Sequence, residues 1–360
     1  MEKIGILTFH RAHNYGAILQ AYGLQEYLKH QGYDVSVVDY CPSYLLRIYA
    51  KYSIRHWFSK YPLQAIKRLL TGPFLYRNRA IRWTKFNRFI ETKLNLYPLA
   101  FNDRLETFDT LILGSDQIWN QGITGGRFDD MYFGGQAVCR IVSYAASNRT
   151  SELSVQEKEY YTEKLRRISA IGVREELLRT LLQPLTDKPI TTTIDPTLLA
   201  GRSIFKQIAI SPKQKQPYVL LYEIESHSES YNIAQSIADQ LHANIIELVS
   251  EPSILRMWQR DQTASPEEFV GYFEHAACVI TTSFHGVAFS VMFNRPFYAI
   301  RQQNSADLRI DSLLSKIGLS CRFVNKQECL TFTEINYSLA NQSLSFEVAR
   351  SESFLRQALM

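Results

Sequence analysis

The sequence predicts an α/β protein with two doubly wound, Rossmann-like domains that face each other across a cleft. Three observations support this fold class. Short apolar, β-branched runs alternate with segments of helical periodicity along almost the whole chain, as in parallel sheets built from βαβ units. The pattern restarts after a polar stretch at residues 211–217. A chain of 360 residues is also long enough to form two hydrophobic cores.

The first half of the chain opens with a clear strand–helix unit. Residues 4–8 (IGILT) predict a buried strand, and residues 16–30 carry apolar side chains at helical spacing until Gly32 ends the helix. Another helix is predicted at about residues 155–167. We expect an N-terminal domain at residues 1–200, with further strands at 34–40, 108–113, 139–145, 168–173 and 190–194.

The second half repeats this alternation. Ser265 is a predicted N-cap, because Pro266 follows it and Glu268 stands three residues after it, as in a capping box. We expect a C-terminal domain at residues 201–360, whose last helix packs back on the N-terminal domain. Its predicted strands are 218–223, 244–249, 277–282 and 296–300, and its predicted helices are 228–241, 266–275 and 284–293.

Composition excludes several classes of protein. With 46% apolar and 21% charged residues, the chain is neither disordered nor fibrous. Its five cysteines are an odd number without a C-x-x-C pair, which favours a reducing compartment without a disulfide framework or a zinc knuckle. The first apolar run is too short for a signal peptide, and no run approaches about 18 residues. We therefore predict a cytoplasmic protein that does not span a membrane.

Positive charge is concentrated in one segment. Eleven of the 40 Lys and Arg residues lie between Asp39 and Glu91, where there is no acidic residue. Eleven aromatic residues accompany them between Tyr44 and Phe89. We interpret residues 42–100 as a basic, aromatic, helical insertion. Its 44–89 portion either packs on the parent domain, lies against an anionic membrane surface, or binds nucleic acid. No nucleic-acid-binding motif is present, so we expect no such partner.

Candidate functional residues lie directly after predicted strands, where loop side chains and helix N-termini meet at one edge of a parallel sheet. In the first loop, Arg11, His13, Asn14 and Gly16 stand at the start of a helix whose N-terminus attracts anions. They indicate a site for an anionic or polyhydroxy ligand. A loop that only caps the helix is the alternative. The loop lacks the glycine spacing of dinucleotide-binding and P-loop motifs.

A second loop follows the strand at residues 108–113. Gly114 and Ser115 allow the backbone to approach a ligand, and Asp116 is a candidate general base. Trp119 offers a surface for stacking on a sugar ring, with Asn120 beside it. The alternative is an aspartate that caps a helix and a tryptophan that belongs to the core.

Three basic side chains complete the candidate set. Arg174 follows a predicted strand, where it either binds phosphate or carboxylate or pairs with the next glutamate. His285 stands between Ser283 and Gly286 after another strand, where it is either structural, a donor to an anion, or a general acid. Arg309 is a further cationic candidate. No metal-binding motif is present, so we predict no metal site.

Five segments together resemble the polysaccharide pyruvyl transferase family. They are FHRAHNYGAILQAYGLQEYL, LILGSDQIWN, VREE, IDPTLL and TTSFHGVAFSVMFNRPF, and the resemblance covers residues 3 to about 318. It implies a fold similar to the GT-B glycosyltransferases, with the donor on the C-terminal domain. It also implies transfer of pyruvate from phosphoenolpyruvate to hydroxyls of a cell-surface glycan precursor, in exopolysaccharide or capsule biosynthesis, to form a pyruvate ketal.

The resemblance assigns Arg174 and His285 as anchors of phosphoenolpyruvate, which is a substrate, and no cofactor is expected. We expect protonated His285 to act as the acid, because protonation of the donor's methylene carbon activates C2 for attack. Some relatives carry an arginine where this chain has Ser283, so Arg11 or Arg309 would supply the missing charge. The predicted donor-binding residues are Arg174, His285, Ser283, Gly286 and Arg309.

The acceptor implied by the resemblance is a sugar or a lipid-linked oligosaccharide. Asp116 is the expected base, and Trp119 together with Trp57 or Trp83 is expected to stack on the sugar. The basic insertion would hold the protein peripherally at the inner membrane face. The candidate acceptor or loop residues are Arg11, His13, Asn14, Gly16, Gly114, Ser115, Trp119 and Asn120.

Two other functions fit the same residues. A GT-B glycosyltransferase would use an Arg- and His-lined cleft for a nucleotide-sugar. A catalytically silent sugar-binding protein of an envelope-assembly complex would keep the fold without the reaction. The identity of the donor separates the first alternative from pyruvyl transfer, and phosphate release separates the second.

Overall fold

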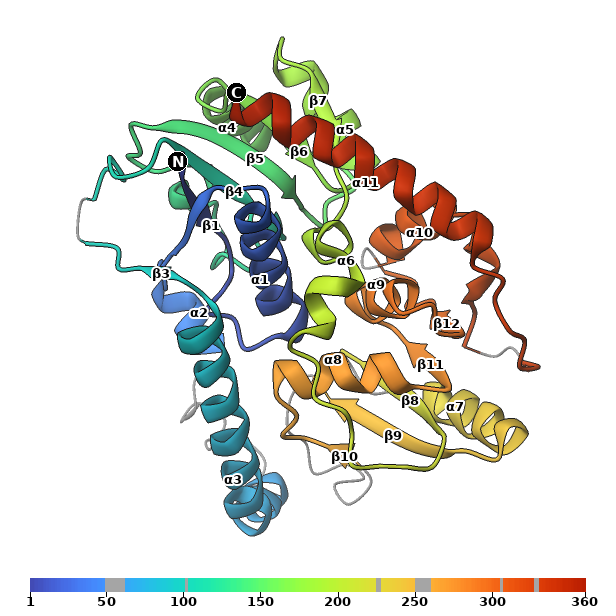
Figure 1. Cartoon of the computed structure of the whole chain (residues 1–360). Helices are drawn as coiled ribbons and strands as arrows, with labels where there is room; N and C mark the ends of the chain where they lie inside the picture. Colours follow the sequence, from blue (N-terminus) through green and yellow to red (C-terminus); the bar gives the residue numbers. More distant parts are fainter. Residues whose placement is uncertain (49–61, 101–102, 225–227, 250–259, 305–306, 327–329) are drawn as a thin grey trace.

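The chain folds into two α/β domains, each built on a parallel sheet (Figure 1). The computed structural model describes residues 1–48, 62–100, 103–224, 228–249, 260–304, 307–326 and 330–360. The predicted fold class, two doubly wound α/β domains, is confirmed. Part of the basic insertion, including Trp57, lies outside the described residues.

The sheet of the first domain contains seven strands among the described residues. They are β1 (Lys3–Leu7), β2 (Asp34–Val38), β3 (Leu96–Tyr97), β4 (Thr110–Asp116), β5 (Arg140–Ala146), β6 (Ala170–Val173) and β7 (Ile190–Thr192). Their order is β3-β2-β1-β4-β5-β6-β7, and every neighbouring pair is parallel. From β1 the chain adds strands β2 and β3 on one side of the sheet, and β4 to β7 on the other. The gap between β1 and β4 is therefore the topological switch point, where ligands of such sheets bind.

The sheet of the second domain repeats this topology. Its described strands are β8 (Tyr218–Glu223), β9 (Asn244–Val249), β10 (Arg260–Asp261), β11 (Cys278–Thr281), β12 (Phe297–Ile300) and β13 (Phe323–Val324). They lie in the order β10-β9-β8-β11-β12-β13, again with parallel neighbours. The switch point of this sheet therefore lies between β8 and β11.

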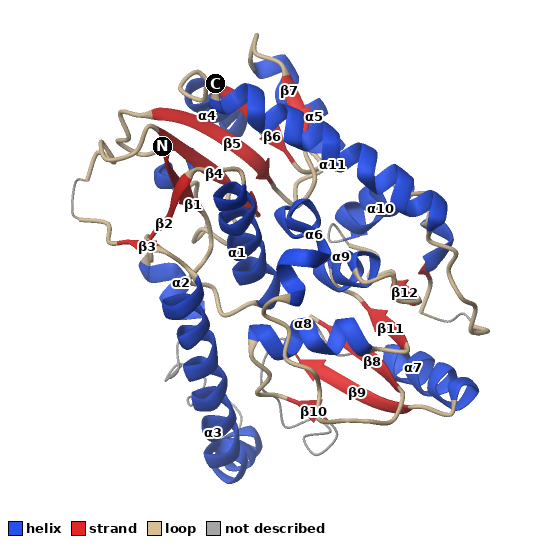
Figure 2. Cartoon of the chain, in the orientation of Figure 1, coloured by secondary structure: helices blue, strands red, loops and turns tan. Residues whose placement is uncertain are grey.

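Helices connect and cover the strands (Figure 2). The α-helices are α1 (Tyr15–His30), α2 (Ser43–Ile48), α3 (Pro62–Lys93), α4 (Val155–Leu165), α5 (Glu176–Leu182), α6 (Pro196–Lys206), α7 (Ser228–Leu241), α8 (Pro266–His275), α9 (Phe284–Met292), α10 (Asp307–Lys316) and α11 (Ser338–Leu359). Short 3₁₀ turns are η2 (Asp130–Phe133), η3 (Gln183–Leu185) and η4 (Ser320–Arg322). None of the helices in the described ranges has the length and apolar character that crossing a bilayer requires.

Local capping explains where two of the predicted helices begin. The Asn14 side chain accepts hydrogen bonds from the amides of Gly16 and Ala17 and starts α1. At α8, Ser265 and Glu268 form the predicted capping box. Both bonds satisfy amide groups that the first turn of a helix leaves without partners.

The described part of the basic insertion forms α2 and α3 and also supplies an edge strand. The short β3 pairs with β2, which the sequence pattern did not predict. Phe86 and Phe89 of α3 are fully buried in the core, whereas Tyr76 and Trp83 are exposed. The aromatic residues of α3 are therefore divided between packing on the parent domain and facing solvent.

Two helices tie the domains together. The α6 helix, which is kinked at Gly201, packs against both α1 and α9. The α11 helix crosses from the second domain to the first (Figure 1). There Arg140 donates to the Ala358 carbonyl at 3.3 Å, and the Ile194 amide donates to Ser351 Oγ at 2.9 Å. These contacts fix the strand ends of one sheet in position relative to those of the other.

Candidate functional site

The candidate site lies where the carboxyl ends of strands from both sheets meet. Asp116 ends β4, Arg174 directly follows β6, and Asp195 lies shortly after β7. From the second domain, His285 lies in the first turn of α9, which follows β11. The structure thus brings Asp116, Arg174 and His285 together, as the strand-end rule suggests.

Arg174 is the centre of a buried charge network. Its side chain is only 4% exposed, and its Nε donates to Glu175 Oε1 at 2.9 Å. Its Nη1 donates to Asp195 Oδ2 at 2.8 Å, and its Nη2 donates to Ser147 Oγ at 3.0 Å. Asp116 Oδ1 lies 3.9 Å from Nη2. Burial opposes the charge, but Glu175, Asp195 and Asp116 together raise the pKa of Arg174.

Asp195 connects this network to the second domain. Its Oδ1 accepts from the amide and the hydroxyl of Thr197 at 2.9 and 2.7 Å, which caps α6. Its Oδ2 faces both Arg174 and His285 Nε2, the latter at 3.7 Å. Burial alone would raise the pKa of Asp195, but His285, Arg174 and the Thr197 amide outweigh it and hold that pKa well below its usual range.

His285 is enclosed by the starts of two helices. A side chain at Gly16 would place its Cβ 2.0 Å from His285 Nδ1, so only glycine allows α1 to approach the imidazole this closely. Ser283 is buried at the N-cap position of α9, and Gly286 packs against Thr281. The switch points of the two sheets therefore meet at the imidazole of His285.

Arg309 differs from Arg174 in its partners. It is 7% exposed, yet it makes no hydrogen bond or ion pair with any described residue. The Phe284 ring lies beneath both guanidinium groups, with centroid distances of 4.8 Å to Arg174 and 5.9 Å to Arg309. Burial and the charge of Arg174 lower the pKa of Arg309 to about 10, so the group remains a cation at neutral pH.

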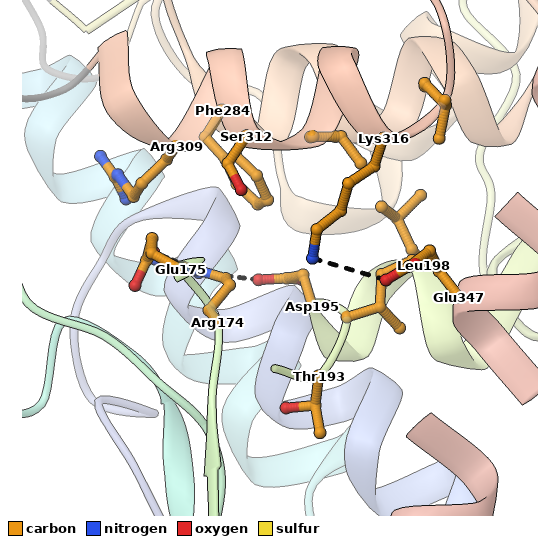
Figure 3. A pocket seen from close by; sticks show the side chains of 13 residues that line it. Arg174, Glu175, Thr193, Asp195, Leu198, Phe284, Arg309, Ser312, Lys316 and Glu347 are labelled. Carbon is orange, nitrogen blue, oxygen red and sulfur yellow. Dashed lines mark hydrogen bonds and ion pairs between the residues drawn. The ribbon is translucent and has the colours of Figure 1, made fainter. Parts of the chain in front are cut away.

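Two cavities share Arg309 in their lining, and Figure 3 shows the smaller one. The smaller has a volume of about 30 Å³ and is lined by Arg174, Asp195 and Phe284, among others. The larger has a volume of about 330 Å³ and lies between α5 and α10. Both are lined by Glu175, Arg309, Ser312 and Lys316. Arg309, a buried cation with no partner in the described ranges, thus stands where the linings of the two cavities overlap.

In the loop after β4, the structure contradicts the sugar-stacking role of Trp119 and gives Gly114 and Asn120 contacts within the protein. Trp119 is fully buried, stacks on Phe133 and donates from Nε1 to the Tyr132 carbonyl, so it offers no surface to a sugar. Gly114 is needed for a protein contact, because a Cβ there would lie 1.9 Å from the Tyr144 carbonyl oxygen. Asn120 bonds within its own loop, to Gln117 and to the amide of Gly122.

Ser115 likewise serves the interior of the first domain. It is fully buried, and its carbonyl accepts a hydrogen bond from Thr8 Oγ1 at 3.0 Å. Asp116 is therefore the member of this loop that reaches the charge network, through its 3.9 Å contact with Arg174.

The loop before α1 contributes mainly structure. Arg11 Nε donates to Asp39 Oδ1 at 2.7 Å, and Arg11 is not among the described residues that line either cavity. Arg11 is thus already paired with a carboxylate, whereas Arg309 has no such partner among the described residues. His13 packs against the rings of Trp83 and Phe86, and burial lowers the pKa of His13 to about 4. Asn14 is the helix cap described above.

Sequence reasoning missed Asp195 and Glu175. The signal for Asp195 was Ile194-Asp195-Pro196-Thr197, an aspartate between a strand and a proline that begins a helix. Glu175 was considered only as a local partner of Arg174, yet it also accepts from Ser147 at 2.7 Å. Among the described residues, no group of three or more His, Cys, Asp or Glu side chains has the geometry to hold a metal ion.

Comparison with known proteins gives a family and several distant structural neighbours. A family model described as polysaccharide pyruvyl transferase matches residues 14–304. No curated protein matches the chain by sequence. The UDP-GlcNAc 2-epimerase from Methanocaldococcus jannaschii is similar in structure, with 10% identity and a TM-score of 0.47, over 97% of this chain and 93% of that one.

Two further structures show the same level of likeness. The UDP-N-acetylglucosamine 2-epimerase from Rickettsia bellii has 11% identity and a TM-score of 0.46, over 100% of this chain and 96% of that one. The MnaA–UDP co-structure from S. aureus has 12% identity and a TM-score of 0.45, over 98% and 89%. The family model, by contrast, matches most of this chain. The chain therefore belongs to the polysaccharide pyruvyl transferase family.

Proposed function

We propose that the protein transfers pyruvate from phosphoenolpyruvate to two hydroxyls of a sugar, which forms a cyclic pyruvate ketal and releases phosphate. Membership of the family supports this reaction class. The observation that carries the proposal is Arg309, a buried cation without a partner among the described residues, at the junction of two cavities. A buried charge is costly unless it is compensated, so this position suits an anionic ligand.

Phosphoenolpyruvate fits the charge pattern around Arg309. The donor carries a carboxylate and a phosphate close together, and a planar guanidinium binds either group through two parallel hydrogen bonds. Arg309 binds one of these groups and fills the role that an arginine at Ser283 has in some relatives. Each hydrogen bond to a charged group contributes about 1.5–3 kcal/mol. Arg174 has its three nitrogens engaged and therefore acts mainly by fixing Asp195 and Glu175.

The reaction requires one acid and one base. His285, whose Nε2 lies 3.7 Å from Asp195 Oδ2 and makes no hydrogen bond with a described residue, protonates the methylene carbon C3 of the donor. This step leaves C2 electron-deficient. A first sugar hydroxyl attacks C2 and gives its proton to Asp116. A second hydroxyl then forms the other C2–O bond and gives its proton to the departing phosphate, which takes the electron pair of the broken C2–O bond. The proton on Asp116 passes through solvent to His285, which restores the acid and the base.

The donor is tested by thermal denaturation of the purified chain with phosphoenolpyruvate, inorganic phosphate, UDP-glucose and UDP-N-acetylglucosamine in parallel. A ligand that binds only the folded state stabilises it by about 2.7 kcal/mol at a hundredfold excess over its Kd. We expect a dose-dependent rise in Tm with phosphoenolpyruvate that exceeds the rise with phosphate. A rise with a UDP-sugar alone would replace this proposal with glycosyl transfer. A glycan-dependent release of phosphate from phosphoenolpyruvate then tests catalysis.

We also propose that α3 lies against an anionic membrane surface during the reaction. Tyr76, Arg77, Trp83 and Arg88 are exposed on this helix, which extends away from the body of the molecule (Figure 2). The combination of exposed aromatic and basic side chains suits a headgroup region. Arg82 is excluded from this surface, because it is buried and donates to Tyr15 Oη at 2.6 Å.

Sedimentation with vesicles of phosphatidylglycerol and phosphatidylcholine tests this surface. The double variant Arg77→Glu/Arg88→Glu is expected to lose most of the vesicle-bound fraction, since each basic residue near the surface contributes about 1 kcal/mol. The control is Arg104→Glu/Arg127→Glu, which changes the net charge equally at exposed positions outside α3. Equal binding by both double variants, or no binding by the wild type, would exclude the membrane surface.

A further inference from the structure

We infer that the cavity of about 330 Å³ between the domains is the binding site for a neutral sugar unit of the acceptor. The role of this sugar as acceptor rests on the proposed function, but the experiment measures sugar binding and does not require the donor. It replaces the expected acceptor loop near Trp119, whose indole is buried.

The cavity is built from both domains. One wall is formed by Asn148, Thr150 and the start of α5, and the opposite wall by α10. Its volume falls in the range of about 300–1,000 Å³ that is typical of small-molecule sites. Because the lining residues come from both sides of the domain junction, a ligand here contacts both domains at once.

Two buried polar groups that face this space lack protein partners. Glu175 is only 5% exposed, and its Oε1 accepts hydrogen bonds from Arg174 and Ser147. Its Oε2 accepts no hydrogen bond from any described residue. Arg309 is similarly buried without a partner in the described part of the chain. Figure 3, which draws the smaller cavity, shows Arg309 and Glu175 on the same side of the view, with Arg309 above Glu175. The first group requires a hydrogen-bond donor and the second requires an acceptor.

A hydroxylated ligand satisfies both requirements. A sugar hydroxyl donates to Glu175 Oε2 and accepts from Arg309, which removes the cost of leaving these buried groups unpaired. The lining also offers the hydroxyls of Ser312 and Ser315 and the amide of Asn148. The apolar side chains of Leu177, Leu178 and Leu308 provide contacts for the C–H faces of the ring.

The charge of the lining argues against a second anion. Three carboxylates, from Glu175, Glu176 and Asp311, line the cavity together with two cations, Arg309 and Lys316. Lys316 also lies 3.4 Å from Glu347, which offsets its charge. The carboxylates already pair with Arg174, Arg179 and Arg301, and the donor is assigned to Arg309, so the described lining residues leave no unpaired cation for a second anion, whereas a neutral sugar requires none.

The cavity also lies in the right place for the reaction. Glu175, Arg309, Ser312 and Lys316 line both this cavity and the smaller one beside Arg174. A sugar in the larger cavity is therefore next to a donor held at Arg309. Glu175 positions the attacking hydroxyl, and Asp116 keeps the role of base.

The test fills the cavity without disturbing the core. Ser315 is exposed on α10 and lines the cavity, so Ser315→Tyr blocks the space from its mouth. The matched control is Ser236→Tyr, at an exposed position of α7. The probes are the methyl β-glycosides of galactose, glucose and mannose, and their binding is measured by saturation-transfer difference NMR with and without phosphoenolpyruvate.

We expect at least one glycoside to bind the wild type and Ser236→Tyr equally, and to bind Ser315→Tyr at least about fivefold more weakly, a loss of about 1 kcal/mol. The Tm and its shift with phosphoenolpyruvate should be the same in all three proteins, which shows that the fold is intact. Equal glycoside binding by Ser315→Tyr, or no glycoside binding by the wild type, would overturn the inference. If glycoside binding is lost in Ser315→Tyr but phosphoenolpyruvate does not raise the Tm of the wild type, the sugar site is upheld and the proposed donor is refuted.

Discussion

The two domains contribute arginines of opposite character to one site. Arg174, from the first domain, donates to Glu175, Asp195 and Ser147 and is fully engaged. Arg309, from the second domain, is buried to the same degree but has no partner among the described residues. The same side-chain type thus has two tasks, since a compensated charge fixes its neighbours and an uncompensated one is available to a ligand.

This difference changes which arginine a binding experiment should target. Substitution of Arg174 leaves Glu175 and Asp195 buried without their cation, so a loss of donor binding would be mixed with a loss of folding. Substitution of Arg309 removes a cation that makes no hydrogen bond or ion pair with any described residue. The second domain therefore offers the cleaner test of donor recognition.

The largest expected effect is on stability. Arg174→Met should lower the free energy of unfolding by about 3–5 kcal/mol, because it breaks a buried ion pair by removing one partner. Urea denaturation measures this loss. In the same experiment Arg309→Met should leave stability unchanged or raise it, since burial of an unpaired guanidinium opposes folding. Equal losses of unfolding free energy in the two variants would contradict the claim that Arg174 is paired and Arg309 is not.

The next effect is on donor affinity. Arg309→Met should weaken phosphoenolpyruvate binding by about 1.5–3 kcal/mol, or roughly 10- to 150-fold, through loss of a charged hydrogen-bonding partner. Isothermal titration calorimetry measures the Kd. Arg301→Met is the matched control, because Arg301 belongs to the same domain, packs on Phe323 and pairs with Asp311 at the surface. A Kd close to wild type in Arg309→Met would remove this residue from the donor site.

A smaller effect is expected at Asp195, where the pH dependence of stability tests its ion pair with Arg174. Asp195→Asn should cost about 1.5 kcal/mol, because the amide oxygen keeps the bond from Thr197 while the ion pair with Arg174 is lost. The folded pKa of Asp195 is depressed, so its stabilising contribution is present above its unfolded pKa of about 3.9 and is lost as the pH falls through the folded value.

The difference in stability between wild type and Asp195→Asn should accordingly stay constant from about pH 8 to pH 5 and shrink below about pH 4. Urea denaturation at each pH measures it. A difference that shrinks as the pH falls from 8 to 6 would mean that His285 and Arg174 do not hold Asp195 as a carboxylate in the folded state.

Local sequence signals predicted much of the fold. The strands β8 and β9 and the helix α7 were predicted to the residue, because apolar runs and helical periodicity are properties of short segments. The edge strand β3 was missed, since its two residues are defined only by their pairing with β2. Its assignment depends on contacts that no local pattern contains.

The site was predictable in part for a similar reason. The strand-end rule selected Asp116, Arg174 and His285, which the structure brings together. Trp119 was assigned wrongly, because its burial depends on Phe133 and other rings that are distant in sequence. The unpaired state of Arg309 is likewise a tertiary property, since nothing in its sequence neighbourhood distinguishes it from a surface arginine.

The smallest expected effect concerns Lys316 and tests whether a cation that already has a protein partner contributes to donor binding. Lys316 lines both cavities, but its Nζ lies 3.4 Å from Glu347 and its side chain is 25% exposed. Lys316→Met should therefore change stability by less than about 1 kcal/mol, as for other partly exposed pairs. It should also weaken phosphoenolpyruvate binding by less than about fivefold, because the cation already has a partner. A loss as large as that in Arg309→Met would show that proximity of positive charge, rather than lack of a protein partner, determines which cation binds the donor.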